Sequence, residues 1–375
     1  MIYLDNAATT RVLPVALEKI VRFAEEDYFN PSAGYAPAIA VKKELHRAAE
    51  TIAEMLGASA DEIIFTSCAT ESNNFALGCG IKNKKGNVVV SSGEHASVYE
   101  CAMRLKSKGM EVRFVDPDSN GHVTPEKVAA ATDENTAFVS VIHCSNETGV
   151  VNDIAAISAT VRKISPKVVV HSDGVQAFAK IRTDVKELGV DLYSISAHKV
   201  GGMKGVGALY VRRGFGMQPV IAGGGQQDGR RSGTENVCGI TSFAAAAKQY
   251  AETAASFDAS ALRKIFTDKF GSMDNVRING GGVTSGYIVS LSFKGLKGEI
   301  IAHGMEDRGI LIGLGSACST HVRSNRVLSA MGVDKEYAQG SVRISFSPFC
   351  NIEDAMTAAD ALEQVTNELR IKMGR

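Results

Sequence analysis

The sequence predicts an α/β fold built on a mostly parallel, seven-stranded sheet with helices on both faces. Short apolar runs alternate with helix-length amphipathic segments, a pattern typical of successive βαβ units. Runs such as residues 167–171 are almost continuous in valine, as expected of strands that are buried on both sides. The chain has 375 residues, of which 45% are hydrophobic and 22% charged. That length allows about two domains with sizeable cores.

Seven candidate strands share this short, β-branched character. They are Ile63–Thr66, Val88–Ser91, Val112–Val115, Ala137–Val141, Val168–His171, Leu192–Ser196 and Gly207–Val211. Helical spacing of apolar residues predicts helices between them over Val98–Lys108 and Ile154–Ile164. An earlier helix is predicted from Pro37 to Leu56, because its apolar residues form one stripe and Gly57 follows as a stop.

The residue pattern changes after an alanine-rich helix predicted at about Asn236–Ala255. Glycine clusters then separate short strands, and an amphipathic helix is predicted from Ile352 to about Leu369. We therefore expect a large domain over residues 15–255. Residues 1–14 and 256–375 are expected to form a smaller α+β domain.

Charge and cysteine content narrow the class of protein. Lys+Arg and Asp+Glu number 41 each, so the formal charge is 41 − 41 = 0, and nothing suggests a nucleic-acid or membrane partner. The seven scattered cysteines include no Cys-x-x-Cys pair, which argues against a disulfide framework and a metal site. The N-terminus shows no basic segment before an apolar run, and no apolar stretch approaches about 18 residues. We expect a soluble, cytoplasmic protein.

Lys199 is the first candidate catalytic residue. It follows a predicted strand, lies among small residues, and precedes a glycine-rich loop. A partly desolvated lysine there has a lowered pKa and becomes nucleophilic toward an aldehyde. A surface lysine in a loop is the alternative for this residue taken alone.

Asp173 ends another buried strand, about one strand–helix unit earlier. The carboxyl ends of parallel strands face the crevice where such sheets bind ligands. An acid at that position would keep the pyridine nitrogen of pyridoxal 5′-phosphate (PLP) protonated, and Gln176 is in reach of the ring hydroxyl. A helix-capping role for Asp173 is an equal alternative.

A candidate phosphate cradle follows the strand Ile63–Thr66. Residues Ser67–Ser72 are small and polar and open a helix, whose free N-terminal amides bind anions. Plain helix capping is the alternative for this segment alone. A second small-residue loop, Arg231–Thr234, adds a hydroxyl and an amide.

These segments, taken in order, resemble the cysteine desulfurases, the NifS/IscS-like branch of class V aminotransferases with PLP fold type I. The resemblance covers essentially the whole chain. It is carried by Tyr3–Thr10, Ala69–Ser72, Glu94-His95, Asn146–Gly149, Asp173–Gln176, Ser196–Lys199, Arg231–Thr234, Ser316–Ser319 and Val342-Arg343.

The resemblance implies a role for each matched residue. Lys199 would form the internal Schiff base, and Asp173 would pair with the pyridinium nitrogen. His95 would stack on the ring as a candidate proton shuttle, although a core histidine is the alternative from sequence alone. Arg343 would clamp the substrate carboxylate with its planar fork. Asn146 and Gln176 would contact the ring oxygen or substrate, and the phosphate would be held by Ala69, Thr70, Ser196 and His198, with Thr234 donated by the partner subunit of a homodimer.

Cys318 distinguishes the cysteine desulfurases from other members of the wider family. It lies in a small, polar segment, where we expect a mobile loop. Its thiolate would take sulfur from L-cysteine as a persulfide, with release of alanine. A buried structural thiol is the alternative. The neighbouring His321 and Arg323 would favour the thiolate if they are close in space.

The resemblance thus implies a PLP-dependent cysteine desulfurase that hands sulfur to an acceptor. That acceptor would be an iron–sulfur scaffold, a tRNA-thiolating enzyme or a cofactor-biosynthesis carrier. Alternatives are a selenocysteine lyase, another class V aminotransferase, or an inactive sulfur-delivery scaffold. The chain departs from the family pattern at residues 30–37, at Cys68 and Ser145 in place of glycine and asparagine, and at Met203 in place of proline.

Overall fold

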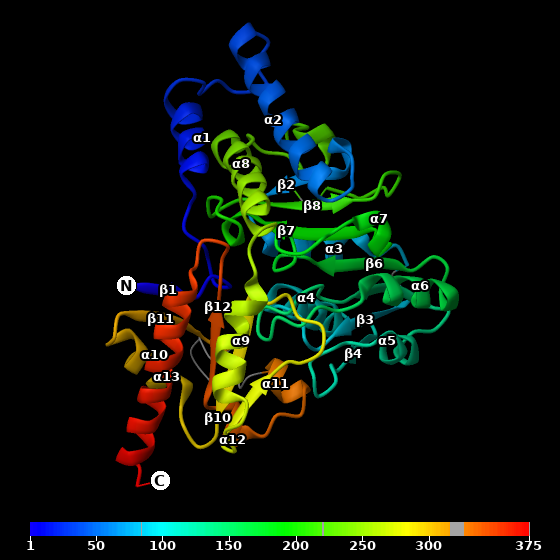
Figure 1. Cartoon of the computed structure of the whole chain (residues 1–375). Coiled ribbons are helices and arrows are strands. Elements are labelled where there is room, and N and C mark those ends of the chain that lie inside the picture. The colour runs from blue at the N-terminus through cyan, green and yellow to red at the C-terminus, as the bar shows by residue number, and fades with distance from the viewer. Residues whose placement is uncertain (84, 220, 316–325, 375) are drawn as a thin grey trace.

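The computed structural model describes all residues except 84, 220, 316–325 and 375. Its larger sheet has seven strands in the order β2-β8-β7-β6-β5-β3-β4 (Figure 1). Strand β8 runs antiparallel to both of its neighbours, and the other neighbouring pairs are parallel. The strands are β2 (Ile63–Thr66), β3 (Asn87–Ser91), β4 (Val112–Val115), β5 (Thr136–Ser140), β6 (Val169–Asp173), β7 (Leu192–Ser196) and β8 (Gly207–Val211).

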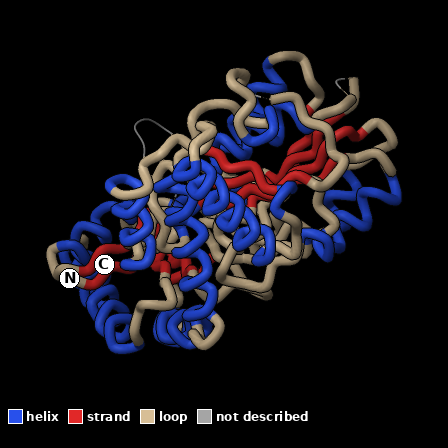
Figure 2. The backbone as a smooth tube through the Cα atoms, turned by 90° about the horizontal axis from the view of Figure 1, so that it is seen from above, coloured by secondary structure: helices blue, strands red, loops and turns tan. Residues whose placement is uncertain are grey.

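Helices cover both faces of this sheet, as the view from above shows (Figure 2). They are α1 (Pro14–Glu25), α2 (Ala36–Met55), α3 (Ala69–Gly80), α4 (Ala96–Ser107), α5 (Pro125–Ala131), α6 (Ile154–Ile164), α7 (Val185–Leu188) and α8 (Val237–Ala254). Three 3₁₀ turns accompany them: η1 (Ala60–Glu62), η2 (Ala197–Lys199) and η3 (Gln227–Gly229).

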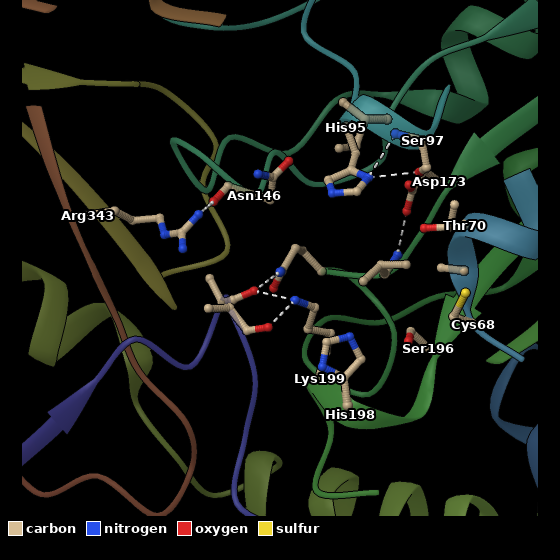
Figure 3. Close-up of a pocket in the computed structure, with 16 residues that line it drawn as sticks. Cys68, Thr70, His95, Ser97, Asn146, Asp173, Ser196, His198, Lys199 and Arg343 are labelled. Carbon is tan, nitrogen blue, oxygen red and sulfur yellow. Dashed lines mark hydrogen bonds between the residues drawn. The ribbon is translucent and has the colours of Figure 1, made fainter. Parts of the chain in front are cut away.

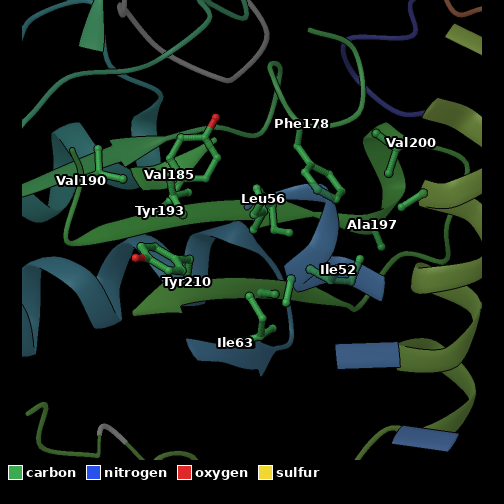
Figure 4. Close-up of a cluster of buried hydrophobic side chains, with 14 of the residues drawn as sticks. Ile52, Leu56, Ile63, Phe178, Val185, Val190, Tyr193, Ala197, Val200 and Tyr210 are labelled. Carbon is green, nitrogen blue, oxygen red and sulfur yellow. The ribbon is translucent and has the colours of Figure 1, made fainter. Parts of the chain in front are cut away.

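Successive residues of the central strands enter two different hydrophobic clusters. Val139 and Val170 belong to the cluster beneath α1, α2, α6 and α8, part of which is shown in Figure 4. Their neighbours Phe138 and Val169 belong to the cluster beneath α3 and α4. Because side chains alternate across a strand, this division means that the sheet is buried on both faces.

A second sheet has five strands in the order β1-β11-β12-β10-β9. Its first strand comes from the N-terminus and pairs in parallel with β11, although more than 300 residues separate them. The strands are β1 (Ile2–Leu4), β9 (Val276–Asn279), β10 (Ile288–Phe293), β11 (Ile310–Leu314) and β12 (Ser341–Ser345). The helices of this part are α9 (Ala259–Phe270), α10 (Gly298–Glu306), α11 (Arg326–Ala330), α12 (Lys335–Ala338) and α13 (Ile352–Lys372).

The expected fold class is confirmed: the sheet is seven-stranded and mostly parallel, and each expected strand lies within two residues of an observed one. The expected helices also lie close to observed ones, and Ile154–Ile164 matches α6 end for end. The division into domains at residues 15 and 255 stays a prediction. No helix in the described part of the chain is both long and apolar enough to cross a membrane.

Candidate active site

A pocket of about 350 Å³ opens beyond the carboxyl ends of β6 and β7 (Figure 3). Residues from both sheets line it, because β12 and the segment after β1 form one of its walls. Parallel strands direct their carboxyl ends toward such ligand sites. The lining residues are Ala7, Ala8, Cys68, Ala69, Thr70, His95, Ser97, Ile142, Asn146, Asp173, Val175, Gln176, Ser196, His198, Lys199 and Arg343.

The amine of Lys199 lies inside this pocket, at the end of the turn η2 that follows β7. Its Nζ donates to the carbonyl oxygens of Ala7 at 2.7 Å and Ala8 at 2.5 Å. Burial, together with the positive charges of Lys180 and Arg343, lowers the pKa of Lys199 to about 7. The lowered pKa leaves more of the amine uncharged near neutral pH, and the uncharged amine is the state that attacks an aldehyde.

Asp173 is buried at the end of β6. Its Oδ2 accepts a hydrogen bond from Nδ2 of Asn73 at 2.8 Å, and its Oδ1 accepts one from the backbone N–H of Val175 at 3.0 Å. The second bond closes a local turn rather than capping a helix. A carboxylate held in this way suits a cationic ring nitrogen in the pocket.

The start of α3 provides an anion cradle. Cys68 is the residue that precedes the helix, and its side chain makes no capping hydrogen bond, so the first amides of α3 are not used by a cap. Ser196 Oγ is buried without a hydrogen-bond partner among the described residues. Gly207 lets β8 pass close by, since a Cβ there would lie 2.7 Å from the carbonyl carbon of Cys68. An orphaned hydroxyl and free helix amides fit the phosphate of PLP.

Arg343 stands at the opposite end of the pocket, on β12. Its Nη2 donates to Oδ1 of Asp5 at 2.9 Å, and its Nη1 donates to the carbonyl oxygen of Asn146 at 3.0 Å. Its Nε is buried without a partner in the described part of the chain. The planar guanidinium is therefore fixed in orientation, as recognition of a carboxylate requires.

Gln176 connects the pocket to a second amine. Its Nε2 donates to the carbonyl oxygen of Ala7 at 3.0 Å, and its Oε1 accepts from Nζ of Lys180 at 2.7 Å. Burial lowers the pKa of Lys180 to about 8. The Gln176 amide is thereby held in one orientation, beside a group that carries positive charge.

His95 directly precedes α4 and is exposed at the pocket, so it is not a histidine of the hydrophobic core. Its Nδ1 lies 2.8 Å from Oγ of Ser97 and 3.2 Å from the backbone nitrogen of the same residue (Figure 3).

His198 also lines the pocket, and its Nδ1 lies 3.1 Å from Oγ1 of Thr9. Burial and the charge of Lys199 lower the pKa of His198 to about 4, so this ring is neutral at physiological pH.

The structure brings most of the sequence-predicted site residues together. Ten of them line this pocket: Ala69, Thr70, His95, Asn146, Asp173, Gln176, Ser196, His198, Lys199 and Arg343. Thr234 is exposed and does not line the pocket of its own chain, and Cys318 lies outside the described residues. The role of each residue stays a prediction.

Four contributors were missed in the sequence. Two are the carbonyl oxygens of Ala7 and Ala8, which hold the Lys199 amine; backbone groups of alanines carry no chemical signal in a sequence. The others are Asn73 and Ser97. Ser97 stands two residues after His95, a spacing at which a backbone N–H meets a capping side chain.

Two departures from the family pattern have local explanations. Cys68 adopts φ −177°, an extended conformation open to any residue, so glycine is not required there. Ser145 Oγ accepts hydrogen bonds from the backbone N–H groups of Glu147 and Thr148 at 3.3 Å each. Asparagine forms the same kind of turn, so the serine preserves this loop.

Comparison with known proteins agrees with the fold. Residues 2–357 match the family described as Aminotransferase class-V. A cysteine desulfurase IscS from Dictyoglomus turgidum is 35% identical over 379 residues, covering 98% of this chain and 95% of that protein. A solved NifS-like protein superposes with a TM-score of 0.89 at 34% identity, covering 99% of each chain. A structure of SspA in complex with cysteine superposes with a TM-score of 0.82 at 31% identity, covering 94% of this chain and 100% of that one.

A mostly parallel seven-stranded sheet, with a ligand-sized pocket and a half-buried amine at its carboxyl edge, is the architecture of an α/β enzyme. The match over residues 2–357 makes the assignment specific. The chain belongs to the aminotransferase class-V family.

Proposed function

We propose that this protein is a PLP-dependent cysteine desulfurase, which moves the sulfur of free L-cysteine onto its own Cys318 as a persulfide and releases alanine. The observation that carries the proposal is the position of the Lys199 amine, in one pocket with Asp173 and Arg343. Similarity over 98% of the chain to a cysteine desulfurase, and to SspA in complex with cysteine, supports cysteine as the substrate.

The pocket residues fit each part of the cofactor. Lys199 is the residue to which the aldehyde would be joined, and Asp173 would pair with the ring nitrogen. The first amides of α3 would bind the phosphate with Thr70, Ser196 and His198. When bound, PLP supplies a ring that accepts electrons from the α-carbon of the substrate.

The residues of the chain divide the remaining work. Arg343 binds the substrate carboxylate, and Asn146 and Gln176 line the same pocket. The uncharged Lys199 amine takes the α-proton, for which a pKa of about 7 is well matched to neutral pH. The Cys318 thiolate then attacks the substrate sulfur: the S–S bond forms, the C–S bond breaks, and the electron pair and a proton pass to the carbon skeleton that leaves as alanine.

A homodimer forms part of the proposal. Thr234 is exposed on a loop that an ion pair fixes to α3. In this ion pair, Nε of Arg231 lies 2.9 Å from Oε1 of Glu71. Donation of Thr234 to the phosphate site of a second copy would complete two shared sites. The sulfur acceptor would be an iron–sulfur scaffold, a tRNA-thiolating enzyme or a cofactor-biosynthesis carrier.

The decisive experiment compares Cys318→Ala with the control variant Cys101→Ala. Cys101 lies on α4, and burial raises the pKa of its thiol. We expect PLP-loaded wild type and Cys101→Ala to form alanine and a persulfide from cysteine. Cys318→Ala should form neither at an appreciable rate. Native alanine production by Cys318→Ala would contradict the persulfide route.

Borohydride reduction of the PLP-loaded protein, followed by peptide mass spectrometry, checks the attachment point. Label on the peptide that contains Lys199 supports the proposal, and label elsewhere contradicts it. Comparison of kcat/KM for cysteine and selenocysteine separates a desulfurase from a selenocysteine lyase. Radiolabelled sulfur on Cys318, offered to each class of acceptor, identifies the partner.

A further inference from the structure

A line of hydrogen bonds joins Asp173 to His95 through Asn73 and Ser97, two residues without a role in the proposed mechanism. Asn73 is fully buried in α3, and its Nδ2 donates to Oδ2 of Asp173 and to Oγ of Ser97, both at 2.8 Å. Ser97 Oγ lies 2.8 Å from Nδ1 of His95. In this line, the hydrogen-bonding role of each residue determines where the next residue directs its hydrogen.

The carboxylate of Asp173 determines the orientation of Asn73. Both carboxylate oxygens accept hydrogen bonds, so the amide nitrogen of Asn73 must face Asp173. A flipped amide would set two oxygens against each other at 2.8 Å. The two hydrogens of the amide are then used, one toward Asp173 and one toward Ser97.

The orientation of Asn73 determines the role of the Ser97 hydroxyl. Its oxygen accepts from Asn73, so its single hydrogen is free for His95 Nδ1. The backbone N–H of Ser97 donates to the same ring nitrogen at 3.2 Å. Nδ1 of His95 therefore accepts two hydrogen bonds, and a neutral ring must carry its proton on Nε2.

We propose that Asn73 and Ser97 are positioning residues that hold His95 as the neutral Nε2–H tautomer, so that this ring offers the pocket a hydrogen-bond donor and not a base. A proton added at Nδ1 would face the backbone N–H of Ser97. The Ser97 hydroxyl hydrogen would also lose its acceptor.

The consequence concerns the division of proton transfers. His95 lines the pocket, and Nε2 is the nitrogen left for a bound ligand (Figure 3). With Nδ1 occupied and Nε2 already protonated, His95 cannot remove a proton from a substrate. That task belongs to Lys199. Only this last step rests on the proposed function; the tautomer follows from contacts within the protein.

The test measures where His95 carries its proton. Histidine labelled with ¹⁵N at both ring positions is incorporated, and the His95 signals are assigned by their loss in His95→Gln. Spectra are recorded at pH 7 for the apoprotein and the PLP-loaded protein. We expect wild type to carry the proton on Nε2 in both forms. A proton on Nδ1, whether in the other tautomer or in the doubly protonated ring, would overturn the proposal.

Two variants test the positioning role itself. Loss of one neutral hydrogen bond corresponds to about a five-fold change in an equilibrium. Ser97→Ala should therefore raise the ratio of Nδ1-protonated to Nδ1-free His95 about five-fold, and Ser97→Thr should restore the wild-type ratio. Asn73→Ala should act in the same direction, because the Ser97 oxygen would be free to accept from His95.

The matched control is Ser158→Ala, since Ser158 is also a buried serine but its Oγ has no partner in the described part of the chain. It should leave the His95 spectrum unchanged. Identical spectra for wild type, Ser97→Ala and Asn73→Ala would refute the positioning role. Because the apoprotein alone gives this answer, a protein that proves to lack desulfurase activity would sink the proposed function and leave the tautomer standing.

Discussion

Lys180 and Lys199 are linked through a single backbone oxygen. Lys180 donates to Oε1 of Gln176, Gln176 donates to the carbonyl oxygen of Ala7, and that oxygen also accepts from Lys199. Two half-buried amines thus share one small polar network. The positive charge of Lys180 disfavours a second positive charge on Lys199, and this repulsion is one cause of the lowered pKa of Lys199.

Lys180→Met should raise the pKa of Lys199, because it removes one of the charges that lower it. A smaller fraction of the amine is then neutral at pH 7. We expect the rate at which the apoprotein takes up PLP to fall at pH 7, with its pH midpoint moved upward. Lys180→Arg keeps the charge and should stay near wild type, as should Lys248→Met on the exposed face of α8. An unmoved midpoint in Lys180→Met would show that Lys180 does not tune the amine.

Arg343→Lys should weaken binding of the substrate carboxylate. Lysine keeps the positive charge but loses the planar fork that contacts Asp5 and Asn146. We expect KM for cysteine to rise about tenfold or more, with a smaller change in kcat, since about 1.4 kcal/mol of lost binding corresponds to tenfold. Arg213→Lys, at an exposed ion pair with Asp61, is the control. Steady-state kinetics in which KM stays native would argue that Arg343 does not bind substrate.

Glu94→Gln should change how stability depends on pH. Burial raises the pKa of Glu94 well above its ordinary 4.5, and the charge of Asp173 raises it further. The folded state therefore holds this proton to higher pH than the unfolded state does. The free energy of unfolding of the wild type then falls as pH rises from about 4.5 toward the folded pKa, by at most about 1.4 kcal/mol per pH unit.

In the wild type the backbone N–H of Ile142 donates a hydrogen bond to the Glu94 side chain. Glutamine does not titrate, and its side-chain oxygen can accept the same hydrogen bond. The variant should therefore gain stability relative to wild type as the pH is raised from 5 to 8. Urea unfolding of the apoproteins measures the difference, with Glu252→Gln as the exposed control. A difference that stays constant over this range would be inconsistent with a buried, proton-binding carboxyl.

The part of the site that lies within short segments could be predicted from the sequence. Asp173 ends one strand and Lys199 follows another, and each strand contains valine or isoleucine, so the position of both residues at the sheet edge follows from local pattern. The Asn73 contacts differ, since they join residues 24 and 100 positions apart. They depend on how α3 packs against α4 and β6, and no spacing rule encodes that distance.

The pairing of β1 with β11 shows the same limit on a larger scale. A three-residue strand at the N-terminus has no periodicity that names its partner. Its placement nonetheless brings Ala7 and Ala8 to the pocket wall and Asp5 into contact with Arg343. No local pattern indicates the contribution of Ala7 and Ala8, because tertiary packing determines it.

Gly174→Ala should destabilise the protein and disturb Asp173 at once. A Cβ at position 174 would lie 1.9 Å from Cζ of Tyr193, inside the core. The Tyr193 hydroxyl is hydrogen-bonded to Nδ1 of His143 at 2.7 Å, so the ring cannot move aside freely. Overpacking of this kind costs about 1–3 kcal/mol, and relief through the backbone would displace the adjacent Asp173.

We expect Gly174→Ala to lower the free energy of unfolding by that amount and to weaken PLP binding. Gly78→Ala is the matched control, because Gly78 lies on α3 with nothing within 4 Å of its added Cβ. Alanine is the better helix former, so this control should stabilise the protein by about 0.5–1 kcal/mol. Urea unfolding and PLP titration measure both quantities. Full stability and full cofactor affinity in Gly174→Ala would contradict this prediction. Such a result would mean that the Tyr193 ring can move aside and that the position of Asp173 does not depend on a glycine at position 174.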